Sequence, residues 1–163
     1  MQDSKRGSLP MAHGTILNNK QCRQSDEEKK KMEKAPYAST IGSIMYAMLC
    51  TRPDVSYALS MTSRYQQNPG ESHWKAVKNI LKYLRRTKDM FLIYGGLEEE
   101  LAIKCYTDSS FQTDRDDSRS KTGFVFVLND CAITWKSIKQ SVVAQSTAKS
   151  EYIVVSESAK ESA

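Results

Sequence analysis

The sequence predicts an α+β protein in which a helical segment precedes a small antiparallel sheet and a final helix. Three observations lead to this fold class. Apolar residues recur at helical spacing up to about residue 88. Short β-rich runs separated by turn signals follow from residue 89. The last pattern, "SVVAQSTAKSEYIVVSESAKE", begins extended and becomes helical near Ser146 or Thr147. This order of elements is typical of an α+β fold.

Residues 1–36 are expected to form an extended lead-in with one short helix. Up to residue 24 the chain has no sustained periodicity and contains glycine, proline and a polar run. Ser25 and Glu28 have the spacing of a capping box, in which each side chain bonds the other residue's backbone N–H. The helix through "DEEKKKMEK" should therefore begin after Ser25 and end before Pro36.

Residues 37–88 are expected to form a segment of successive helices. The stretch "YASTIGSIMYAMLC" is small and apolar, which predicts a buried helix. Its apolar stripe consists of Ile41, Ile44, Met45 and Met48. Pro53 suits the first position of the next helix, and "NPG" at 68–70 ends that helix.

The helix that begins near Glu71 is expected to be amphipathic with a cationic outer face. Its apolar positions are Trp74, Val77, Leu81 and Leu84. Its cations include Lys75 and four nucleic-acid-binding candidates, Lys78, Lys82, Arg85 and Arg86. Such a face can hold successive phosphates, although a solvated lysine face is the commoner explanation of this pattern by itself.

Four runs in residues 89–163 favour strands, and we expect three or four antiparallel strands there. The runs are "MFLIY", "LAIKCYT", "TGFVFVL" and "CAITWKS". The dipeptide "ND" between the last two predicts a tight hairpin.

Charge is unevenly distributed along the chain. Residues 1–95 hold 16 Lys and Arg against 8 Asp and Glu, whereas residues 96–163 hold 8 against 11. A basic half joined to an acidic half suggests a surface that binds a polyanion beside a site that binds a cation. Surface lysines that only keep a domain soluble explain the charge equally well.

The lengths of the apolar runs and the spacing of the cysteines also limit the class of protein. No apolar run approaches the roughly 20 residues of a membrane span, so we expect a cytoplasmic or nuclear protein without a membrane partner. The four cysteines are widely scattered, which makes a zinc site improbable.

Two carboxylates are candidate metal ligands. Asp108 lies where the strand "IKCYT" ends, a position at which Asp is more often a turn former. Glu151 lies within an apolar stripe of the last helix, so it should face the sheet and need a cation, a partner or a water-filled cleft. If that helix crosses the strand, the two acids can converge on Mg²⁺, which prefers carboxylates, waters and phosphate oxygens.

Residues 106–152, "YTDSSFQTDRDDSRSKTGFVFVLNDCAITWKSIKQSVVAQSTAKSEY", resemble the opening half of the ribonuclease H domain of copia-type LTR retrotransposon Pol polyproteins. The matching elements are an aromatic-x-D strand end, an acidic loop, S-x-T-G-F-V-F, W-K-S-x-K-Q and S-T-x-x-x-E-Y. Residues 37–96 resemble the stretch that joins the reverse transcriptase of the same polyproteins to its ribonuclease H. The resemblance covers nearly the whole chain.

The resemblance implies an organisation and an activity. Residues 37–88 would be the reverse transcriptase C-terminal or connection segment, and residues 89–163 an incomplete ribonuclease H-like domain. In the complete protein the activity would be hydrolysis of the RNA strand of RNA–DNA hybrids, with two Mg²⁺ ions or Mn²⁺ as a substitute and no small-molecule cofactor. Asp108 and Glu151 would be the first and second catalytic, metal-binding acids. The rest of the polyprotein would be a partner, and a virus-like particle a further location.

The sequence also departs from the family pattern. It lacks the aromatic-x-D-D turn of the polymerase, and it stops before the strand and helix that carry the family's later acids. The isolated chain is therefore expected to be inactive. Asp114, Asp116 and Asp117 lie in a loop that resembles the family's solvated acidic turn, whereas Lys136 and Lys139 are candidate substrate contacts. A non-catalytic nucleic-acid-binding remnant, or a degenerate copy without function, remains an alternative.

Overall fold

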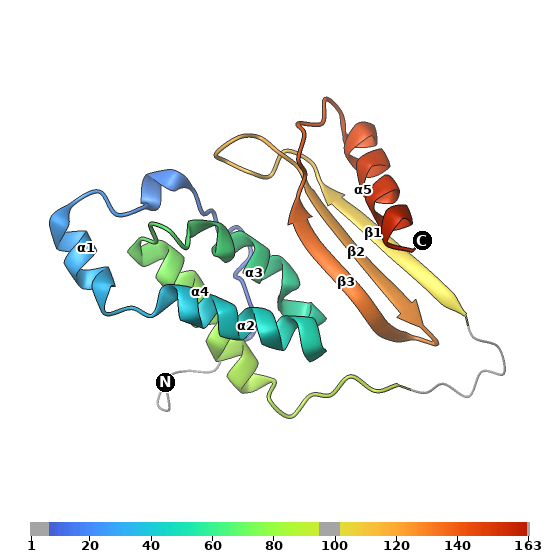
Figure 1. Ribbon diagram of the computed structural model, residues 1–163, viewed down its shortest axis with the longest axis horizontal. Coiled ribbons are helices and arrows are strands. Elements are labelled where there is room, and N and C mark those ends of the chain that lie inside the picture. The colour runs from blue at the N-terminus through green and yellow to red at the C-terminus, as the bar shows by residue number, and fades with distance from the viewer. Residues whose placement is uncertain (1–6, 95–101, 163) are drawn as a thin grey trace. The chain divides into compact units, whose positions relative to one another are not determined.

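The computed structural model describes residues 7–94 and 102–162. The chain divides into two compact units, Met1–Met90 and Phe91–Ala163, which are described separately. The described residues are α+β: helices occupy the first unit, and a three-stranded antiparallel sheet and one helix occupy the second (Figure 1). The expected order of helices, antiparallel strands and a final helix is confirmed.

The first unit begins with irregular chain and short helical turns. The 3₁₀ turn η1 (Asn19–Gln21) precedes α1 (Asp26–Glu33). The predicted capping box is present, because the Ser25 side chain accepts a hydrogen bond from the Glu28 N–H while Glu28 accepts one from the Ser25 N–H. Both bonds satisfy N–H groups near the start of α1 that no turn of the helix could satisfy.

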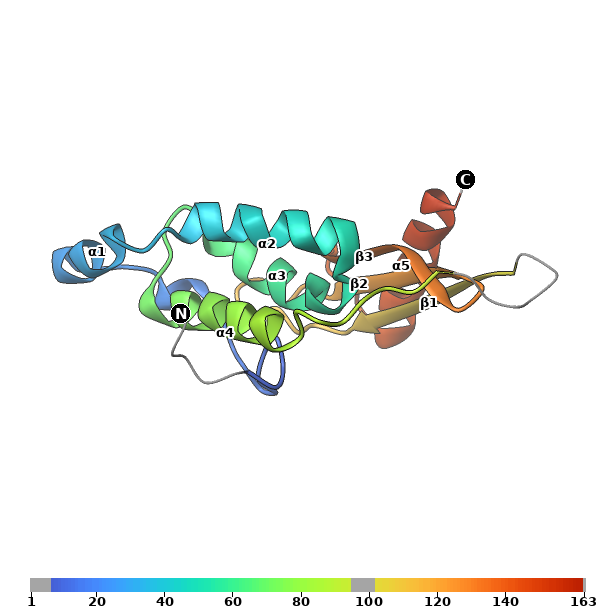
Figure 2. The same cartoon turned by 90° about the horizontal axis from the view of Figure 1, so that it is seen from below.

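Three further helices build the core of the first unit. They are α2 (Tyr37–Thr51), α3 (Ser56–Thr62) and α4 (Glu71–Arg86). The 3₁₀ turns η2 (Pro53–Val55) and η3 (Ser63–Tyr65) flank α3. Helices α2 and α4 lie side by side and α3 packs against both (Figures 1 and 2). Pro53 occupies the first position of η2, where a missing N–H costs nothing.

Side chains from all three helices meet in one apolar cluster. Ile41 and Ile44 of α2 and Val77 and Ile80 of α4 are each at most 2% exposed. The prediction that α2 is buried holds for this face only. Its other side exposes Tyr46 and Leu49, because the neighbouring helices cover one side of α2.

The second unit is a meander of three strands. They are β1 (Ile103–Ser110), β2 (Lys121–Leu128) and β3 (Cys131–Lys139), in the order β1-β2-β3. Asn129 and Asp130 have φ angles of 45° and 64°, the left-handed pair that a tight hairpin requires. The hairpin predicted from "ND" is therefore present.

One face of this sheet carries the helix α5 (Thr147–Glu161), as Figure 1 shows. The buried Phe124 and Phe126 of β2 lie on the same sheet face as Ser109 and Lys136, both of which bond α5 side chains. The half-buried Trp135 pairs with Val125, so strand alternation places it on the opposite face.

One predicted strand is wrong. Residues 90–94, "MFLIY", are irregular, and Phe91 and Ile93 are 83% and 79% exposed. β-propensity alone does not make a strand, since its N–H and C=O groups need a neighbour with which to pair. The sheet accordingly has three described strands.

Candidate functional site

Asp108 lies near the end of β1, directly opposite Gly123 of β2. Its side chain is exposed and, within the described part of the chain, has no hydrogen-bond or ion-pair partner. Gly123 has no side chain that could cover the sheet surface beside Asp108. The carboxylate oxygens of Asp108 are therefore accessible to a ligand from solvent.

Glu151 lies in the second turn of α5. Ser146 begins this helix by accepting a hydrogen bond from the Lys149 N–H, so the cap determines where Glu151 falls on the helix. Glu151 is exposed, but its Oε1 accepts a hydrogen bond of 3.0 Å from the Ser109 hydroxyl. Glu151 therefore faces the sheet as expected, but it does so at the exposed edge strand and not in the core.

Both acids lie at the same end of β1, Asp108 as a residue of the strand and Glu151 through its contact with the next residue. Glu151 bonds Ser109, the residue that follows Asp108. Successive side chains of a strand leave opposite faces, so β1 alternation assigns Asp108 to the face away from Ser109. Among residues 7–94 and 102–162 no group of three or more His, Cys, Asp or Glu side chains could hold a metal ion.

The donor types at this end of β1 suit Mg²⁺, which binds carboxylate oxygens and retains several waters. The number of acids is smaller than a two-metal site requires, since the described residues contribute only Asp108 and Glu151. Because alternation puts Asp108 on the face of β1 away from Ser109 and Glu151, the two acids do not form a magnesium site by themselves, and further carboxylates would have to complete one.

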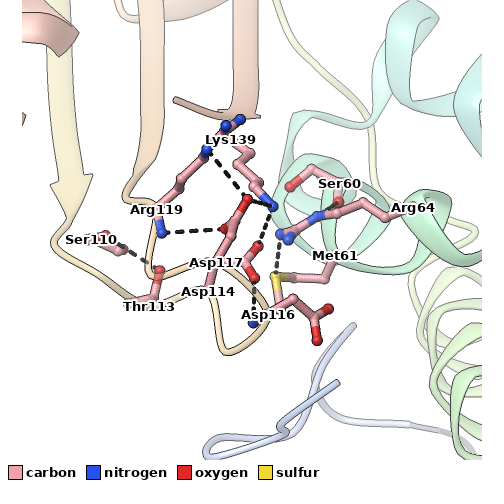
Figure 3. Close-up of polar contacts among 10 residues, drawn as sticks. All are labelled: Ser60, Met61, Arg64, Ser110, Thr113, Asp114, Asp116, Asp117, Arg119 and Lys139. Atoms are coloured by element: carbon pink, nitrogen blue, oxygen red, sulfur yellow. Dashed lines mark hydrogen bonds and ion pairs between the residues drawn. The ribbon is translucent and has the colours of Figure 1, made fainter. Parts of the chain in front are cut away.

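The acidic loop after β1 is an internal ion-pair cluster. Asp114 is 4% exposed, so its resemblance to a solvated turn was misleading. The Lys139 ammonium lies 3.1 Å from Asp114 Oδ2 and 2.7 Å from Asp117 Oδ2, between the two acids (Figure 3). Arg119 Nε lies 3.3 Å from the same Asp117 oxygen. A buried carboxylate requires such a partner, because its desolvation is costly.

The two candidate lysines of β3 are therefore engaged within the second unit. Lys139 neutralises Asp114 and Asp117. Lys136 lies 3.3 Å from the Glu161 carboxylate at the end of α5 and 6.0 Å from the centroid of the Phe124 ring. Contact with a substrate would require either lysine to share or exchange its partner.

The cationic residues of α4 lie on its outer face. Lys78, Lys82 and Arg85 are partly buried and Arg86 is exposed, and their spacing of about one turn aligns them along the helix. Lys75 forms an exposed ion pair of 2.8 Å with Glu71. We refer to Lys78, Lys82, Arg85 and Arg86 as the cationic stripe.

A polar cluster anchors the end of α4 next to this stripe. The Arg52 guanidinium donates hydrogen bonds to both Asp54 carboxylate oxygens, at 3.0 and 2.7 Å. The Tyr83 hydroxyl also donates to Asp54, at 2.7 Å. Burial raises the pKa of Asp54, but hydrogen bonds from Arg52 and Tyr83 outweigh it, and the net pKa is lowered. Burial, and then the hydrogen bond from Tyr83 to Asp54, raise the pKa of the Tyr83 phenol.

Sequence reasoning missed Ser109 and Gln140. Ser109 holds the Glu151 carboxylate, and Gln140, 1% exposed, bonds α5 at Ser150. The available signal was a polar residue among strand positions that pack against a helix, which predicts a buried hydrogen bond.

Known proteins that resemble this chain were found among full-length sequences, whereas no family model and no solved structure matches it. It is 45% identical over 161 residues to the retrovirus-related Pol polyprotein from transposon TNT 1-94 of Nicotiana tabacum, covering 99% of this chain and 12% of that protein. It is 36% identical over 127 residues to the Pol polyprotein from transposon RE2 of Arabidopsis thaliana, covering 77% of this chain and 8% of that protein.

A third relative is much shorter. The secreted RxLR effector protein 161 of Plasmopara viticola is 36% identical over 130 residues, which make up 80% of this chain and 91% of that protein. Among the described residues, no helix has both the length and the apolar character needed to cross a membrane.

The likeness to tobacco and Arabidopsis polyproteins extends across both units. The chain therefore belongs to the Pol polyproteins of copia-type LTR retrotransposons.

Proposed function

We propose that this segment, within a complete Pol polyprotein, contributes to Mg²⁺-dependent hydrolysis of the RNA strand of RNA–DNA hybrids, leaving a 3′-hydroxyl. The observation that carries the proposal is the hydrogen bond from Ser109 to Glu151, which brings the Glu151 carboxylate beside the residue that follows Asp108. Membership of the Pol polyprotein family adds support, as does the resemblance of the sequence around both acids to the ribonuclease H pattern.

Asp108 and Glu151 are the residues that would hold the metal. Both are exposed carboxylates at one end of the edge strand β1, although Asp108 leaves the face opposite the one that Glu151 meets, and no side chain at Gly123 crowds Asp108. When bound, Mg²⁺ supplies charge that activates an attacking water and stabilises the leaving oxygen. Further acids from the longer polyprotein would complete the ligand set, since the described residues hold no three-acid cluster.

The cationic stripe would hold the hybrid through its phosphates. Phosphate contacts position a duplex without reading its sequence, and 2′-hydroxyls in the wide minor groove distinguish an RNA strand from DNA. Lys136 and Lys139 stay secondary candidates, because carboxylates within the chain already pair with both.

The test is a labelled-hybrid cleavage assay in Mg²⁺ and in Mn²⁺ on this 163-residue chain and on a longer polyprotein segment. We expect cleavage by the longer segment only, and its loss in Asp108→Asn and in Glu151→Gln. Lys160→Gln, a change on the same helix away from the acids, is the control and should retain activity. Metal-dependent cleavage by the short chain that disappears in Asp108→Asn would contradict the requirement for further acids.

A second function is binding of nucleic acid without cleavage. It is favoured by the cationic stripe on α4, which belongs to the first unit and does not depend on whether the acids of the second unit form a metal site. Binding by the longer segment with no cleavage under any metal condition would select this function.

A further inference from the structure

Gln140 is a buried residue that directly follows β3, and its side-chain amide contacts Ser150 in the first turn of α5. Its backbone N–H donates to the Ser120 carbonyl at 2.9 Å. Its Nε2 lies 3.1 Å from the Ser150 carbonyl oxygen, 3.3 Å from Ser150 Oγ and 3.3 Å from Thr122 Oγ1. A carbonyl oxygen can only accept, so the contact with Ser150 requires the NH₂ end of the amide to face α5.

These contacts form a closed path around Glu151. Ser150 precedes Glu151 on α5, and Gln140 links it to Thr122 of β2. Thr122 is the cross-strand partner of Ser109, and the Ser109 hydroxyl bonds Glu151. Glu151 is thus tied to the sheet from both sides, through its neighbour in the helix and through its own carboxylate.

We propose that Gln140 is a positioning residue for Glu151, holding the start of α5 at the distance from β1 that the Ser109–Glu151 hydrogen bond requires. The consequence for metal binding rests on the proposed function, whereas the positioning itself does not. Partners of this kind behind a metal ligand typically change metal affinity about 10- to 100-fold when removed.

The NH₂ group of the Gln140 amide supplies the hydrogen-bond donor that this position needs. Nε2 donates to Ser150 and Thr122 at once, and all three side chains are at most 1% exposed, so water cannot replace a lost donor. Methionine has a similar length and no donor. A glutamate is nearly isosteric and can donate to the Ser150 carbonyl only when protonated, and burial raises the pKa of such a carboxyl.

The experiment uses NMR on the metal-free 163-residue chain. The readout is the nuclear Overhauser effect between the Ser109 β-protons and the Glu151 γ-protons, followed by Mg²⁺ titration of the Asp108 and Glu151 signals. We expect Gln140→Met to remove the Overhauser contact and to raise the Mg²⁺ dissociation constant about 10-fold. Lys160→Met, at an exposed side chain near the other end of α5, is the control and should change neither.

Gln140→Glu keeps the proposal testable if Gln140→Met does not fold. We expect the Ser109–Glu151 contact to be present at about pH 5.5, where the buried carboxyl is protonated, and lost near pH 8. A folded Gln140→Met protein with an unchanged contact and Mg²⁺ constant would overturn the proposal, as would a contact in Gln140→Glu that ignores pH. A contact that depends on Gln140 in a 163-residue chain that binds no Mg²⁺ supports positioning and shows that the short chain lacks a complete metal site; failure of the nuclease function itself would appear as no cleavage by the longer segment.

Discussion

Removal of the cationic stripe should abolish most of the salt dependence of hybrid binding. The stripe runs from Lys78 to Arg86 on α4, eight steps along the helix that span about 12 Å at a rise of 1.5 Å per residue. One strand of a duplex presents a phosphate about every 3.4 Å along its axis, so four cations can meet about three or four phosphates. The expected slope of log K against log salt is then roughly −3.

That slope predicts a measurable change. Between 50 and 200 mM salt the wild-type chain should lose about 60-fold in affinity for an RNA–DNA hybrid. Alanine at all four stripe positions should bring the slope close to zero. Fluorescence anisotropy of a labelled hybrid at four or five salt concentrations measures both quantities.

The control must remove the same charge elsewhere. Helix α1 and the residue after it offer four lysines, and their simultaneous replacement by alanine changes the net charge equally. These residues are Lys29, Lys30, Lys31 and Lys34. We expect this variant to retain most of the wild-type slope. An equal loss in both variants, or a stripe variant with the wild-type slope, would show that net charge and not the α4 face causes the binding.

Two predictions concern stability, both measured by urea unfolding followed by circular dichroism. Asp54→Asn should cost roughly 1–2 kcal/mol at pH 7, a discounted figure because the Asp54 side chain is 35% exposed. The Asp54 pKa is lowered in the folded chain, so its stabilisation is complete above the ordinary aspartate pKa and is lost as pH falls through the folded value. A difference from wild type that is as large at pH 3 as at pH 7 would contradict this reasoning. Ile80→Ala, at a side chain with no exposure, should cost about 2–5 kcal/mol, whereas Ile93→Ala, at a side chain 79% exposed, should cost under about 0.5 kcal/mol. Equal costs would mean that Ile80 does not pack as described.

Elements that depend on residues close together in the chain could be predicted from the sequence. The Ser25 cap, the hairpin at Asn129 and the amphipathic α4 follow from hydrogen bonds and periodicities that close within a few residues. The two acids were found by a family pattern, and their role as metal ligands stays a prediction.

Which groups meet across the fold depends on packing between elements far apart in the chain. The run 90–94 has the residues of a strand but no strand beside it, and α2 has apolar residues on two sides but neighbours on one. Lys139 pairs with the buried Asp114, and Gln140 bonds α5, because β3 and α5 pack there. The register of β1 against β2 decides that Ser109 faces Glu151, since a shift of one residue would exchange the two faces of the strand.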